Sequence, residues 1–148
     1  MNHRQVLQTL AAIVIAGLLA GCAMMQPSNT VRLTGALSGI NEVPPLINEG
    51  KGVVEASLNK DTKLLKWKVS YSGLTGPAAA GHFHGPASSG QNAAVVLGFK
   101  GSVASPFEGE AVLTDAQVID VIAGRWYVNI HTARHPPGEI RAQLVPVN

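Results

Sequence analysis

The sequence has very little cysteine, since Cys22 is the only one among 148 residues. A single thiol excludes an intrachain disulfide and a metal site built from several thiolates. An excess of one charge is also lacking, because 11 Lys and Arg residues stand against 9 Asp and Glu residues without a basic run. Nucleic acid is therefore not an expected partner. No Ser-His-Asp or paired-carboxylate arrangement can be picked out, so hydrolase chemistry has no support.

Long apolar runs are lacking too, and the one clear run stands near the N-terminus, over residues 10–20. It is too short to cross a bilayer core of about 30 Å, so it is typical of a signal peptide. The run ends in Leu19-Ala20-Gly21-Cys22, which resembles the lipobox of bacterial lipoproteins. We expect a signal peptide over 1–21, lipidation of Cys22 and a tether over 22–29. An ordinary secretory peptide with a chance Cys is the alternative.

This N-terminus predicts an exported protein that is anchored by lipid in the bacterial cell envelope, on the periplasmic side of the inner or outer membrane. The lipid would be its only contact with the membrane. The sequence names no protein partner and no oligomeric state. A domain without disulfides must then be stabilised by its hydrophobic core, which is feasible at this length.

From residue 30 onward the pattern is typical of short strands separated by Gly, Pro, Asn and Asp. Leu65, Trp67, Val69 and Tyr71 alternate with polar residues, as in a strand with one face in a core. With this strand at 65–72, others are expected at 30–37, 51–59, 79–84, 93–99, 107–113, 125–131 and 139–145. About eight strands at this spacing predict an all-β sandwich or barrel.

One segment has helical rather than strand periodicity. Thr114 and Gln117 resemble a capping box, apolar residues at helical spacing follow, and Gly124 supplies a stop. We expect one short helix over 115–123, packed over an end of the sandwich.

Four histidines remain after the predicted cleavage, namely His82, His84, His131 and His135. They fall in two motifs, over residues 81–86 and 127–135. In a strand, residues two apart point the same way and their Cα atoms are about 6.5–7 Å apart. His82 and His84 are therefore expected side by side, close enough for their rings to turn onto one ion.

The parity of the flanking residues indicates which face these histidines occupy. Trp126, Val128 and Ile130 share one parity and belong in the core, so His131 is expected to point outward. Phe83 is the apolar member of the other motif, which turns His82 and His84 outward too. Trp67 and Trp126 are expected to anchor the core. The alternatives are satisfied core histidines and scattered surface histidines that bind nothing.

A shared metal site requires that the two histidine strands are neighbours. Imidazoles without thiolates suit copper, zinc or nickel, and the affinity for divalent ions peaks at copper. Copper is the expected metal, with zinc as the alternative. His135, in a Pro-Pro-Gly loop, is a candidate fourth ligand, an outer contact or a solvated residue. Glu42 is interpreted as a hydrogen-bonding brace of its loop, with contact to a histidine as the alternative.

These motifs carry a family resemblance. Asn-Glu-Val-Pro-Pro at 41–45, Gly-His-Phe-His-Gly-Pro-Ala at 81–87, Tyr-Val-Asn-Ile-His-Thr at 127–132 and Pro-Gly-Glu-Ile-Arg at 137–141 resemble the CHRD (chordin) domain in order and over residues 33–144. The resemblance implies a domain over 30–148 with a single immunoglobulin-like or superoxide-dismutase-like β-sandwich of about eight strands. It implies little about function.

A more distant resemblance is to copper/zinc superoxide dismutase, where a His-x-His and a later His bind copper on the outside of a β-barrel. It implies metal-ligand roles for His82, His84 and His131, and an outward, anion-attracting Arg141. The missing disulfide and zinc-binding loop leave dismutation an alternative only. Glu139 and Arg141, which flank Ile140 on the last strand, are expected to be exposed and to form an ion pair with a neighbour. We expect copper storage, delivery or redox chemistry, with a metal-free adhesion module as the other alternative.

Overall fold

The computed structural model describes residues 29–147. The expected signal peptide over 1–21, the lipidated Cys22 and nearly all of the tether lie outside these residues, so those interpretations stay predictions. Within the described part, no helix is long and apolar enough to cross a membrane.

Eight strands and one α-helix make up the described chain. The elements are β1 (Thr30–Ser38), a 3-10 turn η1 (Gly39–Asn41), β2 (Lys51–Asn59), β3 (Leu64–Ser72), β4 (Ala78–His84), β5 (Val95–Gly98), β6 (Phe107–Val112), α1 (Asp115–Ile122), β7 (Trp126–Thr132) and β8 (Ile140–Pro146). The predicted strands are confirmed within one residue at each end, except that β5 is shorter than predicted.

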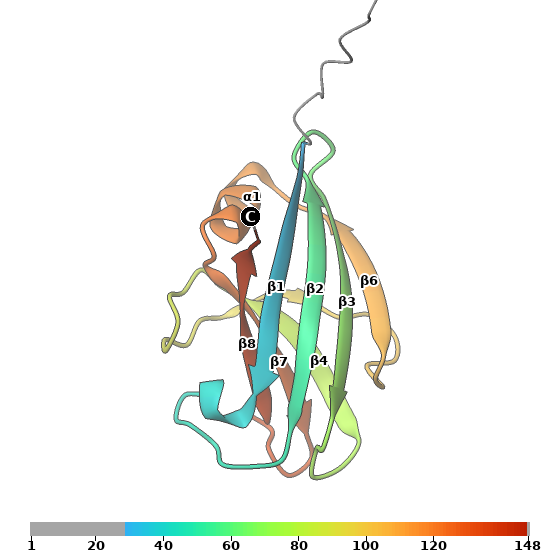
Figure 1. Cartoon of the computed structure of the whole chain (residues 1–148), viewed down its shortest axis with the longest axis vertical. Coiled ribbons are helices and arrows are strands. Elements are labelled where there is room, and N and C mark those ends of the chain that lie inside the picture. The colour runs from blue at the N-terminus through green and yellow to red at the C-terminus, as the bar shows by residue number, and fades with distance from the viewer. Residues whose placement is uncertain (1–28, 148) are drawn as a thin grey trace, which may run out of the picture.

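All strands belong to one antiparallel sheet in the order β5-β4-β7-β8-β1-β2-β3-β6. The sheet curls until β1, β2 and β3 lie across from β4 and β7, as Figure 1 shows. The Trp67 ring on β3 meets the Phe83 ring on β4 edge to face, with centroids 5.2 Å apart. The two halves of the sheet therefore enclose one core, and the predicted sandwich architecture is confirmed.

The core follows the period-2 pattern of the sequence. Leu65, Trp67 and Val69 of β3 are buried, as are Trp126 and Ile130 of β7. Burying a large apolar side chain stabilises the fold by about 1.5–3 kcal/mol, so this shared layer is the main source of stability. Both tryptophans are in the core, as predicted.

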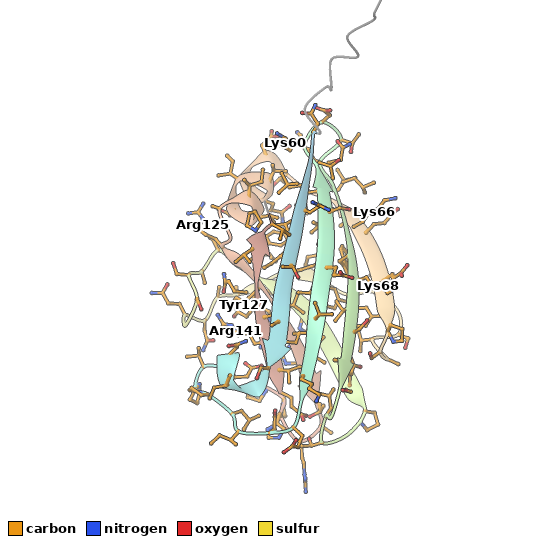
Figure 2. The ribbon with its side chains drawn as sticks, viewed as in Figure 1. Lys60, Lys66, Lys68, Arg125, Tyr127 and Arg141 are labelled. Atoms are coloured by element: carbon orange, nitrogen blue, oxygen red, sulfur yellow. The ribbon has the colours of Figure 1, made fainter. Side chains whose placement is uncertain are left out.

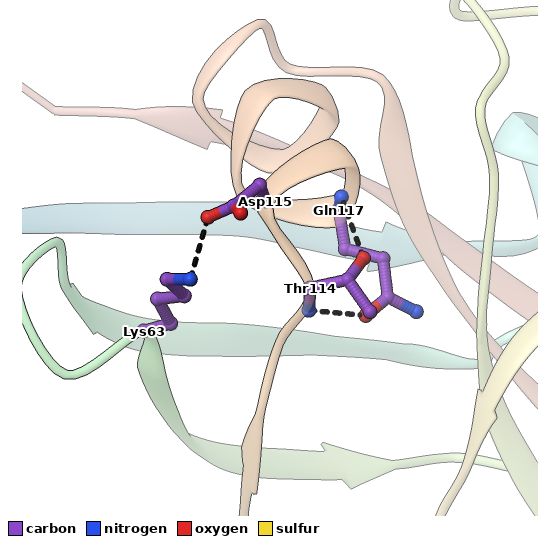
Figure 3. A network of polar contacts seen from close by, with 4 residues as sticks. All are labelled: Lys63, Thr114, Asp115 and Gln117. Carbon is purple, nitrogen blue, oxygen red and sulfur yellow. Dashed lines mark hydrogen bonds and ion pairs between the residues drawn. The ribbon is translucent and has the colours of Figure 1, made fainter.

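The helix α1 begins where its capping box predicts. Thr114 Oγ1 accepts a hydrogen bond from the Gln117 amide at 3.3 Å, and Gln117 Oε1 accepts from the Thr114 amide at 2.9 Å. Lys63 Nζ lies 2.6 Å from an Asp115 carboxylate oxygen, which ties the first turn of α1 to the start of β3 (Figure 3). The helix lies beside the end of β8 (Figure 1).

Two loops cover the outer face of β7 and β8. Asn41 and Asn48, in the segment between β1 and β2, donate to the carbonyls of Arg141 and Glu139. The segment between β4 and β5 lies against the first one, because Asn92 Nδ2 donates to the Val43 carbonyl at 3.1 Å. The outer face that carries the histidines is therefore partly roofed.

Candidate metal centre

Pairing of β4 with β7 brings the two histidine motifs together. In the antiparallel register, His82 lies opposite Asn129, His84 opposite Tyr127, and His131 opposite Ala80. Gly81 and Phe83 face the core from the same strand; a Cβ on Gly81 would come within 2.7 Å of the Phe99 ring. The core side is thus full, and the alternation turns both β4 histidines to the outer face. Both the predicted parity and the required adjacency of the strands are confirmed.

The imidazoles of His82, His84 and His131 form one cluster. Nδ1 of His82 lies 3.0 Å from Nε2 of His131. The His84 ring centroid is 5.7 Å from that of His82 and 6.2 Å from that of His131. One ring nitrogen from each residue lies within 4.8 Å of the other two. All three side chains are half-buried.

Backbone carbonyls orient two of the rings. His84 Nδ1 lies 3.0 Å from the Ala93 oxygen, and His131 Nδ1 lies 2.9 Å from the Pro136 oxygen. A carbonyl only accepts, so each Nδ1 carries the hydrogen and each Nε2 keeps a bare lone pair. Nε2 of His84 is buried and has no hydrogen-bond partner among residues 29–147. Metal-binding histidines typically donate their second N–H to a carbonyl in this way.

The environment keeps all three imidazoles neutral. Burial lowers the pKa of His82 below its usual range. Burial is also the largest cause of the lowered pKa of His84, to which the charges of His82 and Arg141 add, against the hydrogen bond to Ala93. The pKa of His131 is lowered by burial and by the neighbouring histidines, against its bond to Pro136. Neutral imidazole is the form that binds metal, so protons compete weakly near neutral pH.

One nitrogen pair of the cluster has the spacing that a first-row metal ion requires. Two nitrogens at 2.0–2.1 Å from one ion are about 2.9 Å apart at a right angle and about 3.3 Å apart at a tetrahedral angle. The 3.0 Å between His82 and His131 lies within that range. His82 must move its hydrogen from Nδ1 to Nε2 to bind, because His131 Nε2 is the acceptor in the metal-free pair. The cluster offers three imidazole nitrogens, and the buried Nε2 of His84 among them has no hydrogen-bond partner in the described chain. Such a donor set suits copper or zinc.

His135 lies outside this three-histidine cluster. Its backbone amide bonds to Thr132, and its side chain lines a cavity of about 300 Å³ together with His84, Tyr127 and Glu42. The nitrogens that converge come from the other three histidines. Ligation by His135 stays a prediction, and the cluster does not depend on it.

The expected solvent exposure of Arg141 is wrong. The residue is on the outer face, as its parity predicts, but it is only 2% exposed. Its guanidinium donates to Asn92 Oδ1 at 3.0 Å and to the Gln91 carbonyl at 2.6 Å, and it lies over the Tyr127 ring (Figure 2). The roofing loop between β4 and β5 removes it from water. An anion-attracting role stays a prediction, but the guanidinium is committed to protein groups.

The expected exposed ion pair of Glu139 is also wrong. Glu139 is fully buried, and its carboxylate accepts from the Thr75 amide at 2.7 Å, from Thr75 Oγ1 at 2.9 Å and from Thr132 Oγ1 at 2.5 Å. Burial alone would raise its pKa, but these hydrogen bonds together lower it. Glu139 therefore braces the chain that follows His131.

Glu42 connects its loop to the histidine strand. Its Oε2 accepts from Asn129 Nδ2 at 3.3 Å, which supports the interpretation of Glu42 as a brace. Burial raises the pKa of Glu42 to about 7, against the attraction of Arg141 and the bond from Asn129. Its Oε1 has no hydrogen-bond partner in the described part of the chain. A largely dehydrated carboxyl group thus lies at one side of the cavity near His84.

A comparison with models of protein families matches residues 33–144 to the CHRD domain. The chain belongs to the CHRD family. The match spans the three-histidine cluster, the two roofing loops and Arg141, and it confirms the resemblance drawn from the motifs. Neither the curated proteins nor the solved structures include a match to this chain.

Several groups that shape this CHRD site carry no signal in the sequence. The carbonyls of Ala93 and Pro136 are backbone atoms in loops, so no residue type marks them. Tyr127 does carry a signal, because it has the same parity as His131, and this parity predicts a place on the outer face. Its ring stacks on His84 with centroids 4.8 Å apart and planes within 6°.

Proposed function

We propose that this CHRD domain binds one copper ion through His82, His84 and His131. This proposal rests mainly on the convergence of nitrogens from three imidazoles. The second nitrogens of His84 and His131 bond to carbonyls, which turns the lone pair of each Nε2 toward the cluster. Orientation of the ring by a backbone acceptor is typical of histidines that bind a metal ion.

Copper is favoured over zinc by the donor set. The cluster contains nitrogen only, and imidazole sites have their highest divalent affinity for copper. Zinc remains the competitor, because three histidines and a water also suit it. Together with the lipobox predicted at Cys22, this donor set supports storage, delivery or redox chemistry of copper at the cell envelope as the proposed task.

The site supports binding better than it supports dismutation. The dismutase alternative needs a cation that water and a small anion can reach, and Arg141 is buried and hydrogen-bonded to its roofing loop. The metal-free adhesion module is the remaining alternative, and it predicts no stoichiometric metal.

The test is metal analysis of the full-length protein, purified in detergent without a histidine tag and dialysed against equal copper and zinc. We expect about one copper per chain, and zinc only when copper is withheld. A protein that retains neither metal would favour the adhesion module and contradict the proposal. The His131→Ala variant, prepared in the same way, controls for adventitious binding.

A further inference from the structure

Arg141 is a buried cation without an anionic partner at ion-pair distance in the described part of the chain. The ion pairs found among residues 29–147 all use other cations. Its two hydrogen-bond acceptors, Asn92 Oδ1 and the Gln91 carbonyl, are both neutral. Removing a charge from water costs free energy that an ion pair normally offsets. The Glu42 carboxyl group attracts this charge without forming an ion-pair contact with it, and burial of that carboxyl raises its own pKa. A buried charge without a contacting anion next to a metal cluster therefore points to a role in that cluster.

Tyr127 connects Arg141 to a histidine of the site. The guanidinium carbon lies 3.5 Å from the centre of the Tyr127 ring, and the His84 ring stacks on the same tyrosine. Because β7 lies between β4 and β8, the tyrosine lies between the arginine and the histidine. The Arg141 guanidinium is thus separated from the His84 ring by the ring of Tyr127 alone.

Arg141 also holds the segment that orients His84. It bonds to residues 91 and 92, and the next residue, Ala93, accepts from His84 Nδ1. The Ala93 amide donates to the Tyr127 hydroxyl at 3.1 Å, which holds the same residue through a second contact. A shift of this segment would release the His84 ring from the orientation that leaves its Nε2 bare.

We propose that Arg141 is a positioning residue of the metal centre, which holds residues 91–93 against His84 and whose charge favours Cu(I) over Cu(II). This inference rests on the proposed copper binding. Cu(II) carries one positive charge more than Cu(I), so a fixed cation nearby raises the free energy of the oxidised form more. The one-electron reduction of Cu(II) to Cu(I) becomes more favourable.

The test is a mediated redox titration of the copper-loaded, full-length protein, together with copper affinity, in the parent and three variants. Arg141→Gln removes the charge, and Arg141→Lys keeps it but lacks the planar fork that reaches two acceptors. Arg134→Gln is the matched control: it removes the same charge three residues from His131, at an exposed position.

For Arg141→Gln we expect the preference for Cu(I) to fall at least about tenfold, or about 59 mV for a one-electron couple. Arg134→Gln should alter the preference for Cu(I) by less than about twofold, because water and salt screen the exposed charge of Arg134. Arg141→Lys should keep the preference of the parent but bind copper at least about tenfold more weakly, as expected when an outer contact is lost.

If Arg141→Gln changes the preference for Cu(I) no more than Arg134→Gln does, the charge of Arg141 does not favour Cu(I) and this part of the proposal is wrong. Parent-like copper affinity in Arg141→Lys would overturn the positioning role, and this arm decides alone if the Gln variant fails to fold by circular dichroism. A parent that binds no copper would refute the proposed function and this inference together. A copper-binding parent with unchanged variants would refute this inference only.

Discussion

Nδ1 of His82 lies 3.0 Å from Nε2 of His131, on neighbouring strands and 49 positions apart in the chain. In the metal-free protein this contact is a hydrogen bond, with His82 as the donor because His131 already donates to the Pro136 carbonyl. A copper ion would take the place of this hydrogen, which moves to Nε2 of His82, so that the lone pairs of both nitrogens point to the ion. Only neutral imidazoles can bind in this way, so protons and copper compete for the pair. Metal binding and the protonation of this pair are therefore linked.

This linkage predicts how copper affinity depends on pH. The pKa values of the three histidines are lowered from the usual 6.5, mainly by burial. Affinity should stay nearly constant from pH 8 to about 6.5 and fall only at lower pH, where the imidazoles gain protons. Isothermal titration with a copper buffer at each pH would measure it. A steep loss already between pH 8 and 7 would show that the ligands are not these depressed histidines.

The raised pKa of Glu42 predicts a change in stability with pH. Its folded-state pKa of about 7 exceeds the usual 4.5, so its favourable contribution is complete below pH 4.5 and is lost as the pH rises through 7. Glu42→Gln does not titrate. The variant should therefore gain stability relative to the parent between pH 5 and 8, by up to about 3 kcal/mol.

Urea unfolding of the metal-free parent and of Glu42→Gln at pH 5 and at pH 8 measures this gain in stability. Glu49→Gln is the matched control, because Glu49 is an exposed carboxylate in the same loop. If the free energy of unfolding depends on pH equally in the parent and in Glu42→Gln, the Glu42 carboxyl group is not dehydrated as described.

Removing the Glu139 carboxylate should be costly. Glu139→Ala leaves the Thr75 amide and the hydroxyls of Thr75 and Thr132 without their acceptor. We expect a loss of about 2–4 kcal/mol in the free energy of unfolding, since each buried group left unpaired costs about 1–3 kcal/mol. Glu110→Ala, which removes an exposed partner of Lys66, should cost less than about 1 kcal/mol. Similar losses in the two variants would refute the bracing role of Glu139.

The lipid anchor is testable independently of the fold. Cys22→Ser should abolish incorporation of labelled fatty acid and leave the protein uncleaved or mislocalised, because the thiol is the predicted site of acylation. Label retained in this variant would show that Cys22 does not carry the lipid.

The strands and their faces could be predicted because alternation is a local property. Leu65, Trp67 and Val69 are buried as the period-2 pattern requires, and the same parity correctly turned His131 outward. The pairing of β4 with β7 could not be predicted from local alternation, because pairing between distant segments depends on the whole sheet. The motifs of the CHRD family predicted the β-sandwich architecture more specifically than the pattern of any single strand did.

The parity of a residue gives its face but not what covers that face. Arg141 and Glu139 were assigned outward and therefore expected in solvent, yet the loops after β1, β3 and β4 close over them. The short β5 has a related cause: Ala93 bonds to His84 and Tyr127 instead of extending the strand. Sequence periodicity contains no information on such loop contacts.

The shared copper site is tested most directly by copper titration of His82→Ala, His84→Ala, His131→Ala and His135→Ala against the full-length, tag-free parent. Each of the first three should weaken binding by at least about 100-fold, more than the loss of an outer contact, and His135→Ala by less than about tenfold. Metal-free stability should change little in all four, because none of these side chains belongs to the core. A His131→Ala protein that binds copper like the parent, while His82→Ala does not, would contradict the shared site.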